Sequence, residues 1–247
     1  MDLADDRYGS DWADDYDTVT PIPPEQTEKT VSFLARLAGQ GPVLELAAGT
    51  GRLALPLADR GLDVTALDVS APMLAKLRAK DPAGKVTTLT GSMTNIPGER
   101  RYQLIFCVYN SITCLTSQDE QVQFLQSAAG HLADGGVLVL ESMLIDPATF
   151  RHATPLAMTG DALMARFGTY SVLTHMLEQH VLLLRPGQPV SLRPVSGRLV
   201  TPAELDLMAR LAGLRARARY SNWDGAPLTG PGNFINVYEQ PGRGRLS

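Results

Sequence analysis

The chain has few cysteines, no excess of positive charge and no long apolar run, and each shortage excludes a class of protein. Its 247 residues include only Cys107 and Cys114, which excludes a disulfide framework and predicts reduced, largely buried thiols. With 22 Lys and Arg against 26 Asp and Glu, the chain offers no electrostatic footprint for a phosphate backbone, so nucleic acid is not expected as a partner. No apolar stretch approaches the roughly 18 to 20 residues that span a bilayer, so no membrane association is expected.

Two further kinds of signal are missing. The N-terminus is acidic over residues 1–6, where a secretory signal would be basic and then apolar, so we expect a cytoplasmic protein. No group of His, Asp and Glu has the spacing of metal ligands, and we therefore expect no metal.

Short apolar runs alternate with helical stretches through the first half of the chain. Strands are predicted near 43–46, 63–67, 85–89, 103–108 and 136–141, and helices near 51–60, 71–80 and 118–133. The runs at 104–108 and 137–140 are continuously apolar, as in strands that helices cover on both faces. This order predicts a parallel α/β sheet.

The strongest local motif is a strand, an acid, a glycine-rich turn and a helix over residues 43–52, with Glu45, Gly49 and Gly51. Ligands of open parallel sheets bind outside the carboxyl ends of the strands, where glycine lets the backbone approach closely. A second acid, Asp68, ends the next strand about 20 residues later, where a carboxylate can accept hydrogen bonds from both ribose hydroxyls. Together these features favour an adenosine-containing ligand.

The residues next to the glycines indicate which group is attached to the adenosine of that ligand. A pyrophosphate would require the G-x-G-x-x-G loop of dinucleotide-binding proteins, but Arg52 follows Gly51 directly. Glu45 suits a cation better than a phosphate, and S-adenosylmethionine carries both an ammonium and a sulfonium.

These residues resemble the class I S-adenosylmethionine-dependent methyltransferases, and the resemblance runs over most of the chain. Residues 45–51 are similar to the first motif, 91–93 to the adenine-bordering segment, 106–111 to the fourth motif and 131–138 to the helix-turn-strand signature before the fifth strand. The resemblance implies S-adenosylmethionine as cofactor, S-adenosylhomocysteine as product, and a Rossmann-like, mostly parallel seven-stranded sheet. The cofactor-binding residues that motif and resemblance together indicate are Tyr16, Glu45, Ala47, Gly49, Gly51, Asp68, Val69, Met73, Ser92, Met93 and Cys107.

The chain departs from the family pattern at two positions. Ala47 replaces the first glycine of the motif, which predicts a negative φ at that residue. Ser92 replaces the acid that borders the adenine, so we expect a hydrogen bond there without charge and weaker binding.

Four segments are predicted along the chain. Residues 1–24 form an N-terminal arm or lid, 25–146 the Rossmann-like cofactor-binding core, 147–200 a β-rich insertion that covers the substrate, and 201–247 a helix and strands that complete the core. Three arm aromatics, Tyr8, Trp12 and Tyr16, are spaced four apart, which places them on one helical face that either covers a ligand or simply packs. Exposed strands of the insertion could pair in a homodimer.

The layout resembles that of enzymes of secondary metabolism that methylate a small molecule at N or O, less often at C. The N/D-P-P-Y/F motif of enzymes that methylate base amines in DNA is absent, with 108–111 in its place. The candidate substrate-binding residues are Trp12, Tyr109, Asn110, Met143 and Trp223, and the candidate catalytic residues are His175, Tyr109 and Glu141. Because a sulfonium is a good leaving group, in-line orientation can supply most of the acceleration, and a base is needed only if the acceptor must first lose a proton.

Two alternatives stay open at this point. A protein of the same fold could bind S-adenosylmethionine without transferring its methyl group, and product analysis would reveal this. An NAD-dependent oxidoreductase would be revealed by which cofactor raises the melting temperature.

Overall fold

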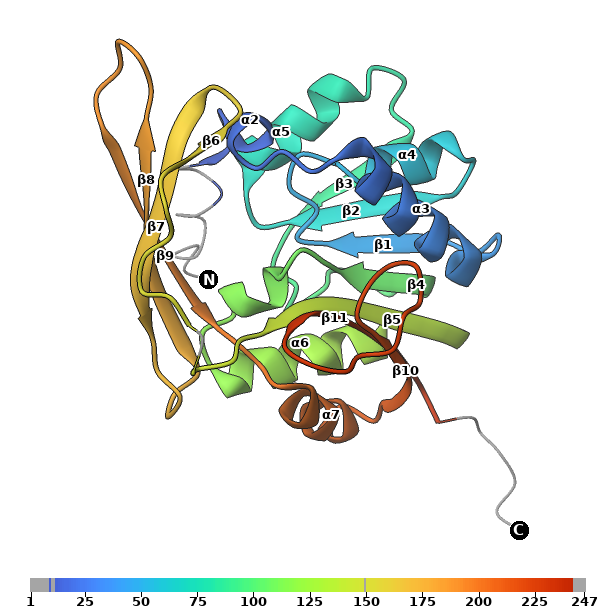
Figure 1. Cartoon of the computed structure of the whole chain (residues 1–247). Coiled ribbons are helices and arrows are strands. Elements are labelled where there is room, and N and C mark those ends of the chain that lie inside the picture. The colour runs from blue at the N-terminus through green and yellow to red at the C-terminus, as the bar shows by residue number, and fades with distance from the viewer. Residues whose placement is uncertain (1–8, 10–11, 149, 242–247) are drawn as a thin grey trace.

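The computed structural model describes residue 9, residues 12–148 and residues 150–241. Tyr8, which the sequence grouped with Trp12 and Tyr16, lies outside these residues. The described chain has a helix-covered central sheet and a separate antiparallel sheet (Figure 1).

The central sheet has seven strands in the order β10-β11-β5-β4-β1-β2-β3, and only β11 runs antiparallel to its neighbours. This confirms the predicted mostly parallel seven-stranded sheet. Its strands are β1 (Val43–Leu46), β2 (Val64–Asp68), β3 (Val86–Thr90), β4 (Tyr102–Cys107), β5 (Leu132–Leu144), β10 (Arg215–Tyr220) and β11 (Gly232–Glu239).

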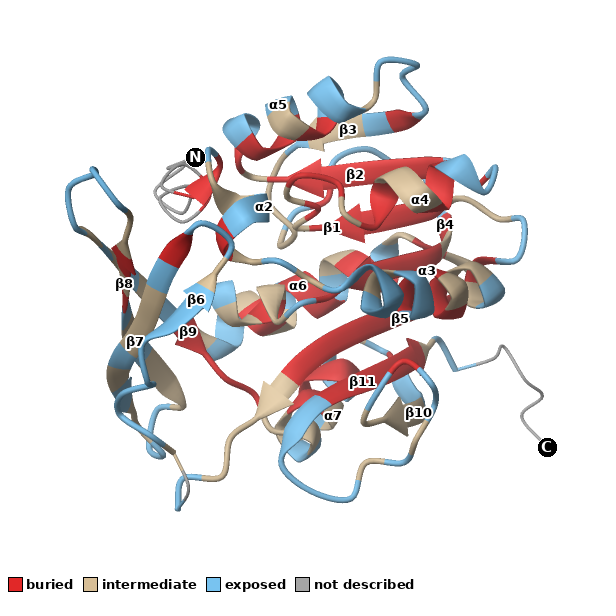
Figure 2. Cartoon of the chain, turned by 45° about the horizontal axis from the view of Figure 1, so that its top comes forward, coloured by how far each residue is buried: buried red, intermediate tan, exposed pale blue. Residues whose placement is uncertain are grey.

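Helices cover both faces of this sheet, which is why β1 and β2 are buried along their whole length (Figure 2). Apolar side chains of α3, α4 and α5 pack on one face, and those of α6 and α7 pack on the other. A short 3-10 helix, η1, follows β4. The bounds are α3 (Pro24–Ala38), α4 (Ala54–Asp59), α5 (Ala71–Lys80), η1 (Ser111–Cys114), α6 (Gln118–Gly130) and α7 (Pro202–Leu211).

The antiparallel sheet stands beside the carboxyl ends of the parallel strands (Figure 1), as expected for an insertion after the fifth strand. Its order is β6-β7-β8-β9, and its strands are β6 (Ala157–Thr159), β7 (Ala162–Tyr170), β8 (Met176–Leu184) and β9 (Ser191–Arg198). The inner face packs on the arm through Val181 and Leu183. Met158 and Leu192 are exposed, and the homodimer expected from this sheet stays a prediction.

The arm is tied to both parts of the molecule by two aspartates that flank Tyr16. Asp15, just before α2 (Tyr16–Val19), accepts hydrogen bonds of 2.8 and 2.9 Å from Arg193 and one of 2.8 Å from Arg185 in the antiparallel sheet. Asp17 accepts one of 2.6 Å from Thr50 in the glycine turn. Burial opposes ionisation of Asp15, but the two guanidinium groups outweigh it and lower the pKa of the Asp15 carboxyl. The arm therefore joins the insertion to the core.

Of the helices in the described part of the chain, none is long and apolar enough to cross a membrane. Within those same residues, no three His, Cys, Asp or Glu side chains gather as ligands for a metal ion.

Candidate functional site

The site lies where the order of the parallel strands reverses. From β1 the chain proceeds outward through β2 and β3 and then returns to β4 on the other side of β1. Glu45 in β1 is opposite Ala66 of β2 and Phe106 of β4. The loops that follow β1 and β4 diverge at this point, so the carboxyl ends of these two strands border a crevice. Ligands of open α/β sheets bind in such a crevice.

The turn after β1 is fixed by hydrogen bonds to β2. The Ala48 N–H donates to the Leu67 carbonyl at 3.1 Å, and the Gly49 N–H donates to Asp68 Oδ2 at 2.7 Å. These bonds require a left-handed backbone at Ala47, whose φ is +55°. The predicted negative φ at Ala47 is therefore wrong, because the strand pairing determines the backbone more strongly than the side chain does.

Gly51 is required for a different reason. Its φ is +85°, and a Cβ at this position would lie 2.6 Å from Cγ of Leu77 in α5. Glycine thus lets the turn pack closely against α5 at this point.

Ala47→Gly is expected to raise the free energy of unfolding by roughly 0.5 to 1 kcal/mol, because it removes left-handed strain that exceeds the added entropy of the unfolded chain. Thermal unfolding of the cofactor-free protein measures this change. The matched control is Ala48→Gly, since Ala48 is buried and does not have a positive φ; it should lower stability. Shifts in the same direction for both variants would contradict the strain at Ala47.

Five of the expected cofactor residues line one cavity. These five come from the turn after β1, the end of β2 and the loop after β3. Two further lining residues, Cys114 and Leu115, belong to η1 and its C-cap. The lining residues are Ala47, Leu67, Asp68, Val69, Gly91, Ser92, Met93, Cys114 and Leu115. The cavity measures about 70 Å³, which is smaller than the roughly 300–1,000 Å³ of ligand pockets.

Cys107 has the burial predicted for its thiol, whereas Cys114 does not, and Met73 packs against the arm. Cys107 is fully buried in the core, and burial raises the pKa of its thiol. Cys114 was expected to be largely buried but is exposed, and it lines the cavity instead. Met73 packs in the apolar cluster with Trp12 and Val19 of the arm, because the arm covers the start of α5.

Glu45 is a buried carboxyl at the inner end of the crevice. Burial raises its pKa to about 8, while the Arg52 guanidinium and the Ala54 N–H act in the opposite direction. Its Oε2 is buried and has no hydrogen-bond partner among the described residues. An unsatisfied buried carboxyl oxygen is costly, and the ammonium of a bound amino acid group would satisfy it. The residues present therefore fit S-adenosylmethionine at both its nucleoside and its amino acid end.

Glu141, near the end of β5, holds two segments together. Its Oε2 accepts the Tyr109 N–H at 2.8 Å, and the carboxylate also accepts a hydrogen bond from the side chain of Trp223. Burial raises the pKa of this carboxyl, and both bonds and the charge of Arg52 counteract the shift. The Arg52 guanidinium lies over the Tyr109 ring, 5.6 Å from its centroid. Arg52 is thus a cation between two buried acids, Glu45 and Glu141.

Some of the candidate substrate residues lie at the ends of the strands, and others pack within the arm and the loops. Tyr109 and Asn110 follow β4, and Tyr109 is exposed. Trp12 is only 2% exposed and lies under the Arg193 guanidinium, 4.7 Å from it. Trp223 packs edge-on against Phe33 in α3. The contacts of these two tryptophans favour packing over substrate contact.

Two other candidates lie at the edges of the site. Met143 is half-buried and pairs with Asn233 in β11. Tyr16 is half-buried in the arm cluster and, with Arg52, lines a second cavity of about 400 Å³ between the arm and α3.

All four histidines are described, and each has a partner outside the crevice. His175 pairs with Glu204 in α7 at 3.2 Å, and His131 bonds the carbonyls of Ser127 and Gly98. His152 bonds the Gly168 carbonyl, and His180 stacks on Phe167. The structure therefore does not bring His175 together with the residues at the strand ends.

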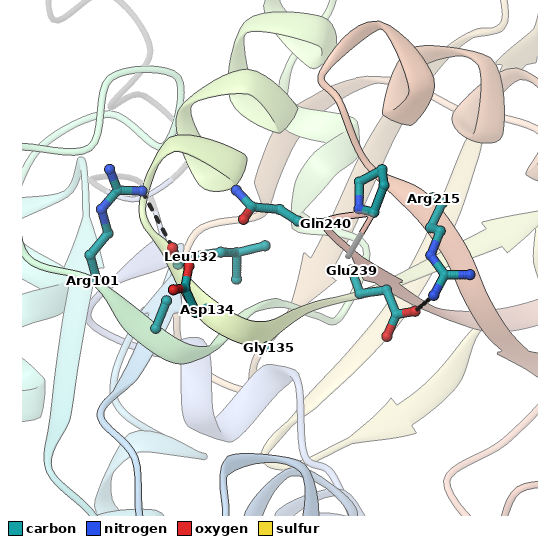
Figure 3. Close-up of a pocket in the computed structure, with 9 residues that line it drawn as sticks. Arg101, Leu132, Asp134, Gly135, Arg215, Glu239 and Gln240 are labelled. Atoms are coloured by element: carbon teal, nitrogen blue, oxygen red, sulfur yellow. Dashed lines mark hydrogen bonds and ion pairs between the residues drawn. The ribbon is translucent and has the colours of Figure 1, made fainter. Parts of the chain in front are cut away.

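A cavity of about 850 Å³ lies at the opposite end of the sheet, beside the start of β5 (Figure 3). Three of its charged residues have protein partners: Arg215 pairs with Glu239 at 2.5 Å, and Arg101 donates to the Leu132 carbonyl at 3.3 Å. Ligands of open parallel sheets bind at the carboxyl ends, so the functional site is assigned to the crevice rather than to this larger cavity.

Sequence reasoning missed Arg52 and Cys114 as members of the site. Arg52 directly follows the glycine turn, and a cation between an acid-ended strand and a helix was a usable signal. Cys114 had no such signal, because its place depends on the 3-10 helix after β4.

Comparison with known proteins agrees with this geometry. A family model described as a methyltransferase domain matches residues 43–136. The cypemycin N-terminal methyltransferase of a Streptomyces species is 28% identical over 192 residues, which cover 76% of this chain and 78% of that protein.

Solved structures extend the similarity to nearly the whole chain. The CcbJ methyltransferase from Streptomyces caelestis is 33% identical with a TM-score of 0.88, over 96% of this chain and 98% of that one. The amino pentose methyltransferase CalS10 from Micromonospora echinaspora shares the fold, with 20% identity and a TM-score of 0.69 over 90% of this chain and 94% of that one. From the crevice at the strand reversal and the full-length similarity to CcbJ, we conclude that this chain belongs to the class I S-adenosylmethionine-dependent methyltransferases that act on small molecules.

Proposed function

We propose that the enzyme transfers the methyl group to an amine nitrogen of a small secondary metabolite. Several relatives are N-methyltransferases by name: the cypemycin enzyme, and the dTDP-3-amino-3,6-dideoxy-alpha-D-glucopyranose N,N-dimethyltransferase of Streptomyces fradiae, which is 30% identical over 139 residues and 54% of each chain. A neutral amine presents a lone pair without prior loss of a proton, so its methylation requires no base.

The cofactor is held by residues at the ends of three neighbouring strands. Asp68 accepts hydrogen bonds from the ribose hydroxyls, and Ser92 and Met93 border the adenine in the cavity that they line with Asp68. Glu45 binds the ammonium through its unpartnered oxygen, and Arg52 attracts the carboxylate. When bound, S-adenosylmethionine supplies an electrophilic methyl group on a good leaving group.

Nitrogen is chosen as the acceptor atom because the Glu141 carboxylate already has hydrogen-bond donors within the protein. This carboxylate accepts bonds from Tyr109 and Trp223, and the four histidines have partners elsewhere. The polypeptide therefore binds and orients the acceptor and excludes water, without removing a proton before the transfer. Holding nucleophile, methyl carbon and sulfur in line supplies most of the acceleration.

A panel of acceptors tests the proposal. Amino sugars, amino acids and amino-terminal peptides are compared with analogues in which a hydroxyl replaces the amine, and the release of S-adenosylhomocysteine is measured together with the methylated product by mass spectrometry. Turnover of amines in step with product supports nitrogen as the acceptor atom. Turnover of the hydroxyl analogues alone would overturn the assignment.

A further inference from the structure

The turn after β4 lies beside the reactive part of the proposed cofactor site. The nucleoside end is anchored at β2 by Asp68 and the ammonium at β1 by Glu45, and the sulfonium connects these two ends. It must therefore lie near the carboxyl end of β1, whose other neighbour is β4. Asn110 is the N-cap of η1, which ends at Cys114 in the nucleoside cavity. The turn thus borders the place where the methyl group is transferred.

The backbone of this turn is strained and firmly held. Tyr109 and Asn110 have φ values of +58° and +63°, and consecutive left-handed residues other than glycine cost about 1–3 kcal/mol each. Glu141 holds the Tyr109 N–H. The Thr113 N–H and Oγ1–H donate to the Asn110 carbonyl at 2.9 and 2.7 Å. These bonds fix the direction of the Asn110 side chain.

That side chain ends in an unsatisfied group. Asn110 Oδ1 is buried and has no hydrogen-bond partner in the described part of the chain. A buried amide oxygen without a donor costs about 1–3 kcal/mol. Strain and an unsatisfied acceptor at one residue indicate a position that is completed by a ligand. The missing partner must be a hydrogen-bond donor.

We propose that Asn110 Oδ1 accepts a hydrogen bond from the N–H of the acceptor amine, and that Glu141 is the positioning residue that holds the turn for this contact. The inference rests on the proposed amine acceptor. The nitrogen lone pair forms the new C–N bond while the C–S bond breaks and its electron pair goes to sulfur. The N–H proton stays on nitrogen during the transfer, and the product ammonium later releases one proton to water.

This contact strengthens as the reaction proceeds. Positive charge develops on nitrogen in the transition state, and hydrogen bonds from charged donors are roughly twice as strong as neutral ones. Asn110 therefore stabilises the transition state more than the ground state, which is the condition for raising kcat. A hydroxyl acceptor gains less, because it must lose its only proton.

Sinefungin tests the contact without knowledge of the acceptor, because its amino group takes the place of the transferred methyl, next to the position of the acceptor nitrogen, and offers N–H donors to the same Asn110 oxygen. Calorimetry compares its Kd with that of S-adenosylhomocysteine, which has no group there. The wild-type chain should bind sinefungin about tenfold more tightly, as expected for one charge-assisted hydrogen bond. Asn110→Gly keeps the left-handed turn without strain, and in this variant the ratio of the Kd of S-adenosylhomocysteine to the Kd of sinefungin should fall to about one. Asn110→Asp, which retains an acceptor oxygen, should preserve or increase it.

Matched variants separate this role from a structural one. Ser142→Ala removes another buried, unpartnered side-chain oxygen and should leave the ratio unchanged. Glu141→Ala should lower the ratio while the Kd of S-adenosylhomocysteine stays constant, and Glu141→Gln should restore part of it. Equal ratios in the wild type and Asn110→Gly, or no preference in the wild type, would overturn the inference. Failure of the amine acceptor itself appears separately, in the turnover of the acceptor panel.

Discussion

Asp68→Asn is expected to weaken the binding of S-adenosylmethionine by about 100-fold or more. Hydrogen bonds to a charged group contribute about 1.5–3 kcal/mol each, and two ribose hydroxyls would lose their ionised acceptor. Each 1.4 kcal/mol corresponds to about a factor of ten in Kd. Asp68 also accepts the N–H groups of Gly49 at 2.7 Å and Ser70 at 2.8 Å. The amide of asparagine keeps one acceptor oxygen, so part of the turn is preserved.

Calorimetric titration measures this loss, and thermal unfolding of the cofactor-free variant shows whether the fold persists. The matched control is Asp63→Asn, because Asp63 precedes the opposite end of β2 and forms an exposed ion pair with Arg100. Exposed pairs contribute about 0–1 kcal/mol, so cofactor binding should be unaffected there. A less than threefold change in Kd for Asp68→Asn would remove Asp68 from the ribose site.

The parts of the site that the sequence could predict are those determined by local patterns. A buried strand ended by an acid and followed by glycines specifies the turn after β1, and Asp68 ends the next strand at the same edge. Because parallel strands place their carboxyl ends together, Glu45 and Asp68 could be assigned to one crevice from their spacing alone.

Features that depend on contacts between distant segments could not be predicted. The left-handed backbone of Ala47 follows from bonds to Leu67 and Asp68. Trp12 is buried because it packs with Val181 and Leu183 and because Arg193 lies over its ring. Asp15 pairs with Arg193 across 178 residues of sequence. Patterns of neighbouring residues carry no information on such contacts, so the arm and the insertion were recognised only as segments.

Glu45 makes the stability of the cofactor-free enzyme depend on pH. Burial raises its folded-state pKa from 4.5 to about 8, so the folded chain holds a proton that the unfolded chain releases. This contribution to stability is complete below about pH 4.5 and is lost as pH rises towards 8. Glu45→Gln carries no titrating proton and should remove this part of the pH dependence of the melting temperature, while the contributions of other groups persist.

Binding of S-adenosylmethionine should show the opposite dependence at the same residue. The ammonium pairs with the ionised carboxylate, so binding below pH 8 releases the Glu45 proton, and the affinity should increase with pH. An α-amino group has a pKa of about 7.7–8.0, so between about pH 5.5 and 7 the ligand keeps its charge and Kd should fall by about 30-fold, or tenfold per unit. Calorimetry at pH 6.5 in buffers of different ionisation enthalpy should detect release of nearly one proton. Glu45→Gln should bind with a nearly flat profile and release none. A wild-type Kd that stays constant over this range would show that Glu45 is not the group that receives the ammonium.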